Sequence, residues 1–530
     1  MPYSSESGKS FVRYIFGKVK NKKILDIGCG SGTYAKMFPN SEFTGIEIWD
    51  PYVERFELNK LYENLHIEDA NNVDYETLGS FDIAVLGDVL EHMEEIKAKD
   101  LFNKISKVAD TVIVSIPIGN YPQDAYDGNP YEEHITNNWT PERVHFVFGK
   151  PDFSHVENEI GVFAWSNQSL KPKICIYAIS KNEAEFVQRF VESAIEADLV
   201  MIADTGSTDA TVIKARIHGA TVYDIFISPW RFDHARNAAL ALIPRDIDIC
   251  ISLDLDEVME PGWREEIERV WRPGITTRLR YMFDWGCGIK FQYEKIHHRH
   301  GYHWHHPCHE YPRPDGRTNE IYAHTDMLLV SHHPDPTKSR GQYLDLLKLS
   351  VEEDPFCPRN AFYYARELMF YRNWEKSIHE CKRYLDLPGA NWHNERCYAY
   401  RVMGKCYDEM GDLRQAEMHY MKAAGEAPNT REPWCELAML MYRQTRWAEC
   451  YAYSIRALEI KNRDLVYTCD PAVWGHWAHD LASVSAWRLG LRDISLEQAK
   501  IAYEITPSDL RLKANLEFLE KEIGPSDLAK

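Results

Sequence analysis

The chain has 530 residues, of which 44% are hydrophobic and 27% charged, and its formal net charge is −20 at pH 7. The length predicts about three domains, and the hydrophobic fraction excludes a disordered chain. A surface this negative repels phosphates and anionic membranes, which argues against nucleic acid as the substrate. The twelve cysteines contain no CxxC pair, as expected for free thiols in a reducing compartment. No signal peptide or apolar run of about 18 residues is present, so we expect a cytoplasmic protein without a membrane span.

Short apolar runs alternate with helical patterns in the first part of the chain. The predicted strands are 23–27, 43–48, 83–86 and 111–116, and a helix is expected to begin over 34–38. Such alternation predicts a parallel sheet covered by helices. We place this first α/β domain at residues 1–168.

A glycine-rich turn follows the first predicted strand, in ILDIGCGSG (24–32). Glycines allow the backbone to turn sharply and to approach a ligand closely. Glu47 ends the second strand, where an acid can bind both hydroxyls of a ribose. Asp69 follows the third strand, and FDIAVLGDVLEHM (81–93) places Asp88 and His92 after the fourth.

In this order the motifs resemble the class I S-adenosylmethionine (SAM)-dependent methyltransferases over residues 10–165. The resemblance implies a cofactor site made of Asp26, Gly28, Gly30, Gly32, Glu47, Asp69 and Asp88. The glycines would line the methionine part, Asp26 would support the turn, and Glu47 and Asp69 would bind the ribose and the adenine.

The segment NPYEEHITNNWTPERVHF (129–146) resembles the substrate loop of small-molecule methyltransferases. His134 or Glu133 would then be the general base for an O-methylation. A solvated surface pair is the alternative interpretation of these two residues. For the whole domain the alternative is an inactive methyltransferase fold, which would either bind the cofactor without catalysis or have a purely structural role.

A second strand–helix series begins after the polar stretch 166–173. We expect strands at 174–179, 199–202 and 249–253 and helices at 182–197 and 211–218. The restart predicts a second α/β domain, which we place at residues 172–340.

Four motifs of this region occur in the order KICIYAISKNEAEF (173–186), VMIADTGSTDAT (200–211), SPWRFDHARNAAL (228–240) and ICISLDLDEVMEPGW (249–263). Asp254 and Asp256 follow an apolar strand, and at this alternation both carboxylates project to one side. A hard divalent cation prefers such oxygen ligands and stabilises a leaving diphosphate. The motifs resemble family 2 glycosyltransferases with the GT-A fold over residues 172–335.

This resemblance implies Mn²⁺ or Mg²⁺, and a nucleoside-diphosphate sugar, with a UDP-sugar first among the donors. Asp256 would be the direct metal ligand and act in catalysis, with His332 as a further ligand. The expected donor-binding residues are Ser180, Asn182, Glu183, Asp204, Arg236 and Asp254. An Asx-turn or helix-capping role is the alternative for Asp204, and a structural hydrogen bond is the alternative for His332.

Glu310 is the first expected base for deprotonating the acceptor and His309 the second, each with a structural role as the alternative. Both lie in the histidine-rich segment 297–310. Imidazole suggests zinc, but the spacing does not resemble a structural zinc site. We expect this segment to cross the acceptor side of the pocket.

From about residue 342 the pattern is wholly helical. The stretches 360–388, 397–428 and 432–460 each read as two helices joined by a polar turn, and Leu413 aligns with Trp447, 34 residues further on. This resembles tetratricopeptide repeats. An unrelated helical bundle is the alternative. We place this all-α domain at residues 341–530. Together with HPCHE and PDPTKSR (334–340), the repeats resemble a bacterial and phage-associated group of tetratricopeptide glycosyltransferases.

The sequence therefore predicts a bifunctional enzyme. It would transfer a sugar, with inversion, to a protein, peptide or glycan acceptor held by the repeats, and would methylate the sugar or the acceptor. The first alternative is a repeat-based scaffold with one or both catalytic domains inactive, and the second is a phage enzyme that modifies DNA or virion proteins. The repeats would also suit a homodimer interface.

Overall fold

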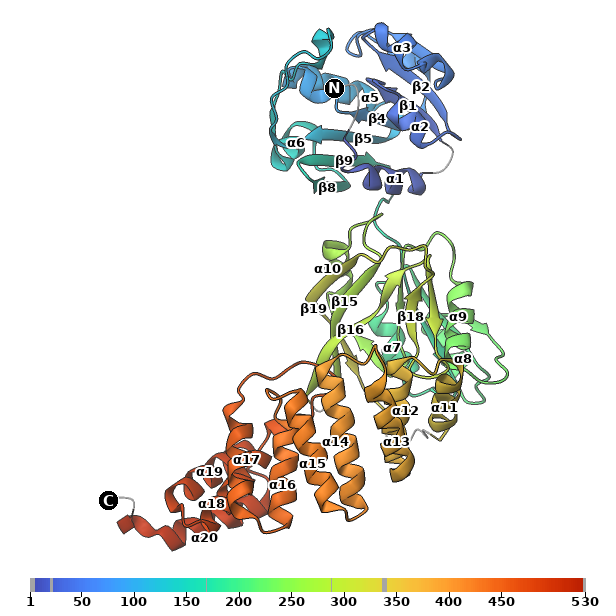
Figure 1. The fold of residues 1–530 in the computed structure, drawn as a ribbon. Coiled ribbons are helices and arrows are strands. Elements are labelled where there is room, and N and C mark those ends of the chain that lie inside the picture. The colour runs from blue at the N-terminus through green and yellow to red at the C-terminus, as the bar shows by residue number, and fades with distance from the viewer. Residues whose placement is uncertain (1–4, 20–21, 168, 287, 336–340, 528–530) are drawn as a thin grey trace. The chain divides into compact units, whose positions relative to one another are not determined.

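The computed structural model describes residues 5–19, 22–167, 169–286, 288–335 and 341–527 (Figure 1). The chain forms two compact units, one of Met1–Pro172 with Trp271–Thr277 and one of Lys173–Val270 with Arg278–Lys530. The expected domain limits at 168, 340 and 530, and the PTKSR part of 334–340, fall outside the described residues. The division into three domains therefore stays a prediction.

The first unit is built on a seven-stranded sheet in the order β3-β2-β1-β4-β5-β9-β8. The strands are β1 (Lys23–Ile27), β2 (Glu42–Glu47), β3 (Asn64–Ile67), β4 (Phe81–Gly87), β5 (Ala109–Pro117), β8 (Phe153–Glu157) and β9 (Ile160–Ser166), with β6 (Gly119–Asn120) and β7 (Asn138–Trp139) as a separate pair. The helices are α1 (Lys9–Lys18), α2 (Thr33–Met37), α3 (Pro51–Arg55), α4 (Tyr75–Leu78), α5 (Glu95–Ile105) and α6 (Pro141–Phe148), with 3₁₀ turns η1 (Leu58–Lys60), η2 (Leu90–His92) and η3 (Pro130–Glu132).

The first five strands of this sheet are parallel, and β8 and β9 run antiparallel to their neighbours. Side chains alternate between two cores: Leu25 and Ile27 belong to one cluster and Ile24 to the other. This alternation explains why short apolar runs are sufficient to predict the strands. Ile275, from the segment Trp271–Thr277, packs against the second cluster.

The predicted strands at 23–27, 43–48, 83–86 and 111–116 are confirmed as β1, β2, β4 and β5. The order of the strands reverses between β1 and β4, which lie side by side with β2 and β5 on their outer flanks. In open parallel sheets, ligands bind outside the carboxyl ends of the strands at such a reversal. The strand order therefore predicts a ligand site at the carboxyl ends of β1 and β4.

The second unit contains an eight-stranded mixed sheet in the order β12-β11-β10-β13-β16-β15-β19-β14. The strands are β10 (Ile174–Ser180), β11 (Leu199–Asp204), β12 (Thr221–Asp224), β13 (Ile249–Ser252), β14 (Glu257–Met259), β15 (Arg278–Gly286), β16 (Ile289–His298) and β19 (Tyr322–His332), with β17 (Tyr302–His305) and β18 (Tyr311–Pro314) as a separate pair. The helices of this region are α7 (Val187–Ser193), α8 (Thr211–Ile217), α9 (Phe232–Leu242) and α10 (Trp263–Val270).

The strands expected at 174–179, 199–202 and 249–253 and the helix at 211–218 are confirmed as β10, β11, β13 and α8. The helix expected over 182–197 is shorter, because α7 covers only Val187–Ser193. Asn182 has a φ of 55°, in the left-handed region that does not continue a helix. Its side-chain oxygen accepts a hydrogen bond from Thr208 N–H at 2.7 Å, which uses the residue for a loop contact instead.

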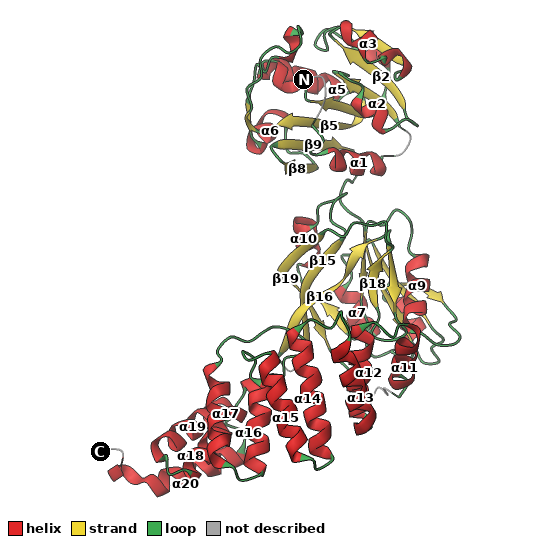
Figure 2. Ribbon diagram, viewed as in Figure 1, coloured by secondary structure: helices red, strands yellow, loops and turns green. Residues whose placement is uncertain are grey.

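Helices alone follow the sheet of the second unit (Figure 2). They are α11 (Tyr343–Glu353), α12 (Pro358–Phe370), α13 (Trp374–Asp386), α14 (His393–Glu409), α15 (Leu413–Glu426), α16 (Glu432–Arg443), α17 (Trp447–Glu459), α18 (Trp477–Arg488), α19 (Arg492–Ile505) and α20 (Leu510–Asp527), with the 3₁₀ turn η4 (Pro471–Trp474) before α18. The three predicted helix pairs are confirmed as α12–α13, α14–α15 and α16–α17, and α18–α19 forms a fourth.

The helical region shares a core with the end of the sheet region. Cys308 lies in one buried cluster with Leu347 and Phe362 of α11 and α12, and Trp230 packs against that cluster. His309 stacks on Tyr363 of α12, with ring centroids 4.0 Å apart. Among the described residues, none of the helices has the length and apolar character needed to cross a bilayer.

Candidate functional site

A cavity of about 390 Å³ opens at the carboxyl ends of the parallel strands of the first unit. It is lined by the residues that directly follow β1, β2, β3 and β4, namely 28–30, 48, 68–71 and 88–89, together with the strand ends. Gly28, Gly30, Glu47, Asp69 and Asp88 all line it. Five of the seven predicted cofactor residues therefore meet at one cavity, at the point where the strand order reverses.

The turn after β1 requires glycine. Gly28 has a φ of 67°, and a Cβ atom there would lie 2.6 Å from Cγ2 of Val89. Its N–H donates to the carbonyl oxygen of Ile46 at 2.8 Å. A side chain at this position would have both an unfavourable backbone conformation and a steric clash at the mouth of the cavity.

Glu47, at the end of β2, is nearly buried. Its Oε2 accepts a hydrogen bond from Gly30 N–H at 2.8 Å and its Oε1 accepts one from Trp49 N–H at 2.9 Å. Burial raises the pKa of Glu47, and the two backbone hydrogen bonds oppose that shift. Each carboxylate oxygen keeps a second lone pair for a ligand.

Asp26 and Gly32 do not belong to the cavity lining. Asp26 is 1% exposed beneath the turn, and its Oδ2 accepts a hydrogen bond from the hydroxyl of Tyr62 at 2.6 Å. Burial raises the pKa of Asp26 to about 7. Its position agrees with a supporting role, whereas Gly32, the residue before α2, packs against Leu61 and Leu58.

Asp69 and Asp88 occupy equivalent places after β3 and β4. Oδ1 of Asp69 accepts a hydrogen bond from Asn71 N–H at 2.9 Å, which closes the turn. Asp88 has a φ of 55°, and its N–H donates to the carbonyl oxygen of Ser115 at 2.8 Å. The Asp69 side chain is thus held by its own turn, whereas Oδ1 of Asp88 lies 3.5 Å from the hydroxyl of Ser115 on β5.

The segment 129–135 also lines the cavity, through Asn129, Glu132 and Ile135 among others. Glu132 is buried, and its Oε1 accepts a hydrogen bond from the hydroxyl of Tyr52 at 2.9 Å. The sequence pointed to this loop as a substrate loop but not to Tyr52 or Glu132. His134 and Glu133, the expected bases, are not among the lining residues.

In the second unit, Arg236 of α9 joins two carboxylates. It is 3% exposed; its Nε donates to Oε1 of Glu310 at 2.5 Å, and one of its terminal nitrogens donates to Oδ1 of Asp254 at 2.6 Å. Lys295 of β16 adds a second cation, 3.3 Å from Oδ2 of Asp254 and 3.0 Å from Oε1 of the buried Glu257. Arg236 is therefore paired with two carboxylates, and Lys295 and Glu257, which the sequence did not indicate, belong to the same network.

Asp256 lies beside a different partner. Its Oδ2 is 3.4 Å from Nε2 of His332, at the end of β19. The pKa of His332 is raised above its usual value. Burial alone would lower it, but the hydrogen bond to Asp256 and the negative charge of Asp256 outweigh that effect. Trp285, which is 49% exposed, lies against the His332 ring with centroids 4.5 Å apart. The two residues predicted to bind the cation are therefore adjacent.

Asp204, expected to bind the nucleotide base, is engaged by its own turn. It is 2% exposed and accepts hydrogen bonds from Ser180 Oγ, Gly206 N–H, and the N–H and Oγ of Ser207. Burial would raise the pKa of Asp204, and these hydrogen bonds lower it instead. The Asx-turn role is thus present, and the contact with a base stays a prediction.

Three further residues expected to bind the sugar nucleotide, Ser180, Asn182 and Glu183, form hydrogen bonds with the same loop. Ser180 donates to Asp204, Asn182 holds the loop through Thr208, and the N–H of Glu183 donates to Oγ1 of Thr211 at 2.8 Å. These contacts place the three residues at the carboxyl end of β10, beside that of β11.

The two expected bases differ in surroundings. Glu310 is held by Arg236, with its side chain 9% exposed. His309 is stacked on Tyr363 and has a φ of 53°. Within the described residues, no group of three metal-ligating side chains gathers in the segment 297–310.

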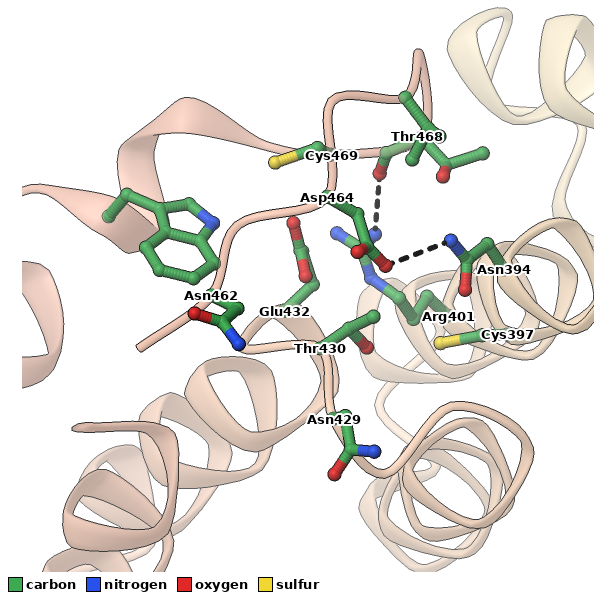
Figure 3. Close-up of a pocket in the computed structure, with 12 residues that line it drawn as sticks. Asn394, Cys397, Arg401, Asn429, Thr430, Glu432, Asn462, Asp464, Thr468 and Cys469 are labelled. Atoms are coloured by element: carbon green, nitrogen blue, oxygen red, sulfur yellow. Dashed lines mark hydrogen bonds between the residues drawn. The ribbon is translucent and has the colours of Figure 1, made fainter. Parts of the chain in front are cut away.

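The helical region contains a small polar cavity of about 20 Å³ between α14, α16 and the segment 462–474 (Figure 3). Arg401 points into it and donates to the carbonyl oxygen of Thr468, and Asn394 donates to Asp464 at 3.3 Å. This space suits a single water molecule, not a peptide.

Comparison with known protein families finds a match within the first unit. Residues 25–110 match the profile of the methyltransferase domain family. The first unit is therefore methyltransferase-like. No curated protein sequence matches the chain.

Several solved structures match parts of the chain at low similarity. A SAM-dependent methyltransferase from Clostridium acetobutylicum is 16% identical, with 30% of this chain and 92% of that chain covered and a TM-score of 0.24. The N-terminal domain of EvdMO1 with S-adenosylhomocysteine (SAH) bound is 16% identical, with 30% and 80% covered and a TM-score of 0.23. YrrB, a TPR protein with an unusual peptide-binding site, is 16% identical, with 35% and 89% covered and a TM-score of 0.28. Likenesses with TM-scores this low carry no conclusion about fold or function.

Proposed function

We propose that the first unit is a SAM-dependent methyltransferase. The observation that carries this proposal is the cavity at the carboxyl ends of β1, β2, β3 and β4, where Gly28, Gly30, Glu47, Asp69 and Asp88 meet. Its volume of about 390 Å³ falls within the range of about 300–1,000 Å³ common for small-molecule sites. The match of residues 25–110 to a methyltransferase domain supports the same class.

The residues around the cavity fit the parts of the proposed cofactor. The glycine turn leaves the backbone open to a close approach, and Glu47 offers two acceptor oxygens to the hydroxyls of a ribose. Asp69 offers an acceptor to an exocyclic amine. SAM, when bound, supplies an electrophilic methyl group, and the acidic rim of Asp88 and Glu47 favours its positive charge.

Calorimetry of the full chain with SAM and with SAH tests this proposal. We expect one molecule of either ligand to bind each chain. The Gly28→Val variant should abolish binding, because its Cβ would collide with Val89. Absence of heat and of competition with either ligand, from a protein with native circular dichroism, would contradict the proposal.

A second function has its own supporting observation in the second unit. We propose that residues 172–335 transfer a sugar from a nucleoside diphosphate, with Asp256 and His332 as ligands of a divalent cation. The 3.4 Å approach of these two side chains, next to the half-exposed Trp285, supports a cation and donor site. Asp256 oxygens and the His332 imidazole are suitable ligands for Mn²⁺, which when bound would stabilise a leaving diphosphate.

The network around Arg236 fits the same reaction. Arg236 and Lys295 bring two cationic groups to Asp254, so this carboxylate is fixed in position. Glu310 is held by the same arginine and is the first proposed base toward an acceptor hydroxyl. The proposed acceptor is a protein, peptide or glycan. The test is release of nucleoside diphosphate from a panel of nucleotide sugars with Mn²⁺, which a chelator should abolish.

A further inference from the structure

Three side chains of the first unit gather beside the cavity in an arrangement that the proposed methyl transfer does not explain. They are Glu91 and His92 of η2 and His134 of the loop that follows η3. One possible ligand atom from each lies within 4.8 Å of the others. Within the described residues, this is the one such group of three.

Glu91 is the unusual member. It is 1% exposed, and within the described part of the chain neither of its carboxylate oxygens has a hydrogen-bond partner. Buried carboxylates are almost always paired, hydrogen-bonded or bound to a metal, because an isolated one loses its hydration without compensation. The two unpartnered oxygens of Glu91 therefore indicate that this carboxylate binds a partner from outside the protein, such as a metal ion.

The two histidines are oriented by the main chain. Nδ1 of His92 lies 3.1 Å from the carbonyl oxygen of Glu133, and Nδ1 of His134 lies 2.6 Å from that of Tyr121. A carbonyl oxygen only accepts, so each Nδ1 carries a proton, and in the neutral ring Nε2 is then the nitrogen with the free lone pair. A metal-binding histidine typically has its second nitrogen fixed in this way. The rings lie at 68° to each other with centroids 4.9 Å apart.

The two segments are fastened together by backbone hydrogen bonds. The N–H groups of Ile135 and Thr136 both donate to the carbonyl oxygen of Glu91 at 2.9 Å, and Oγ1 of Thr136 donates to the carbonyl oxygen of Met93 at 2.9 Å. The loop that carries His134 is thus held against η2. The three side chains are positioned before any ligand arrives, which reduces the entropy lost on binding.

From this arrangement we infer a site for a divalent transition-metal cation, with Glu91 and the Nε2 atoms of His92 and His134 as its protein ligands. Two imidazoles and one carboxylate suit Zn²⁺, Co²⁺, Mn²⁺ or Fe²⁺ better than Ca²⁺ or Mg²⁺, which favour oxygen ligands. His92 also lines the cavity, so the cation lies next to the space assigned to SAM. The site goes beyond methyl transfer, and cation binding is measurable without SAM.

The test is a titration of the full chain, stripped with EDTA and desalted, with Co²⁺, whose visible absorption reports imidazole coordination. Wild type is compared with Glu91→Gln, which has the same shape as glutamate, and with His134→Asn, which keeps an N–H donor near the position of Nδ1 and lacks Nε2. Glu76→Gln and His66→Asn are matched controls outside the cluster. The Asp256→Asn variant is titrated in parallel, because the second unit has its own proposed cation site.

We expect the Co²⁺ signal of the Glu91 site to persist in Asp256→Asn and in both controls. Removing a residue that only hydrogen-bonds to a metal ligand costs about 10–100-fold in metal affinity, so removing one of the three ligands themselves should weaken binding at least tenfold. Zn²⁺ should displace Co²⁺ from this site.

Two results would overturn the inference: a Co²⁺ titration unchanged in both Glu91→Gln and His134→Asn, or no Co²⁺ binding to a wild-type protein that binds SAM. The second result would mean that Glu91 is held as a neutral, protonated acid, and it would leave the methyltransferase proposal standing. Conversely, Co²⁺ binding that persists in Asp256→Asn and is weakened in Glu91→Gln and His134→Asn, in a protein that does not bind SAM, would support the cation site and contradict the proposed methyltransferase function. If Glu91→Gln fails to fold, His134→Asn alone decides, with circular dichroism as its check.

Discussion

Oε2 of Glu47 accepts a 2.8 Å hydrogen bond from the N–H of Gly30, which ties the acid at the end of β2 to the glycine turn after β1. Its other oxygen is bonded to Trp49 N–H. The residue therefore shapes the turn and presents acceptors to the cavity at the same time. A substitution there should affect ligand affinity more than the fold of the sheet.

The Glu47→Gln variant should bind SAM about tenfold or more weakly. A hydrogen bond to a charged group contributes about 1.5–3 kcal/mol, and the amide keeps only one acceptor oxygen. Calorimetry measures the change. Glu42→Gln, at the exposed start of the same strand, is the matched control and should bind as wild type does. Equal affinities in the two variants would remove Glu47 from the ligand site.

The Asp256→Asn variant should lose metal-dependent release of nucleoside diphosphate. Removing a group that stabilises developing charge typically costs about 10²–10³ in rate, and here the cation itself would be lost. Asp326→Asn, exposed on the same strand as His332, is the control. If Asp256→Asn retains the release rate of Asp326→Asn on a donor that wild type uses, the proposed cation site is wrong.

Asp26 predicts a specific pH dependence of stability. Its pKa is about 7 in the folded protein against 3.8 for the free side chain, because of burial. Between these values the folded state holds a proton that the unfolded state releases. The free energy of unfolding of the first unit should therefore fall by up to about 1.4 kcal/mol per pH unit as pH rises through this window. Below pH 3.8 and above pH 7 Asp26 contributes no slope.

The Asp26→Asn variant lacks this titration and should show a flatter profile, gaining stability relative to wild type as pH rises. The free energy of unfolding is measured by urea titration at each pH. At every urea concentration a short deuterium pulse, always at the same pH, labels the unfolded molecules, and the uptake is followed in the peptides that contain β1. Parallel profiles for the two proteins would show that Asp26 does not titrate in this window.

Two glycines of the helical region should respond in opposite directions to alanine. A Cβ at Gly404 of α14 would lie 2.6 Å from two ring carbons of the buried Tyr420, whereas a Cβ at Gly425 of α15 would meet nothing within 4 Å. Alanine is favoured over glycine in a helix by up to about 1 kcal/mol, and overpacking costs about 1–3 kcal/mol. We expect Gly404→Ala to destabilise α14 and α15 and Gly425→Ala to stabilise them.

Hydrogen exchange of the α14 and α15 amides measures both effects, with α18 and α19 as an internal reference. Faster exchange in Gly404→Ala and slower exchange in Gly425→Ala is the expected result. Slower exchange in both variants would mean that Tyr420 moves aside at little cost.

The elements predicted from the sequence are those set by local pattern. The strand 23–27 was predicted to the residue, because Ile24, Leu25 and Ile27 are apolar and a glycine turn ends the run. Glu47 ends β2 and Asp69 follows β3, and both line the cavity because parallel strands bring their carboxyl ends to one edge. Their roles in binding a ligand stay predictions. Helix α7 was predicted too long, since nothing local showed that Asn182 would take a left-handed backbone.

The missed residues depend on contacts between distant segments. Lys295 and Glu257 form a buried ion pair, but one comes from β16 and the other from β14. Glu91 was overlooked beside His92, because its neighbour His134 arrives on a loop whose path only the fold determines. Such pairings are set by strand order and loop packing, which a single sequence does not display.

Hydrogen exchange of the full chain with and without SAH tests most directly whether the cavity binds the proposed cofactor. We expect slower exchange confined to the carboxyl ends of β1, β2, β3 and β4 and the residues that follow them, around 28–30, 47–49, 69–71 and 88–89. Glu47→Gln should weaken this protection at equal SAH concentration, and Glu42→Gln should not. Unchanged exchange at saturating SAH, or protection that appears only elsewhere in the chain, would contradict the proposal that this cavity binds the methyl donor.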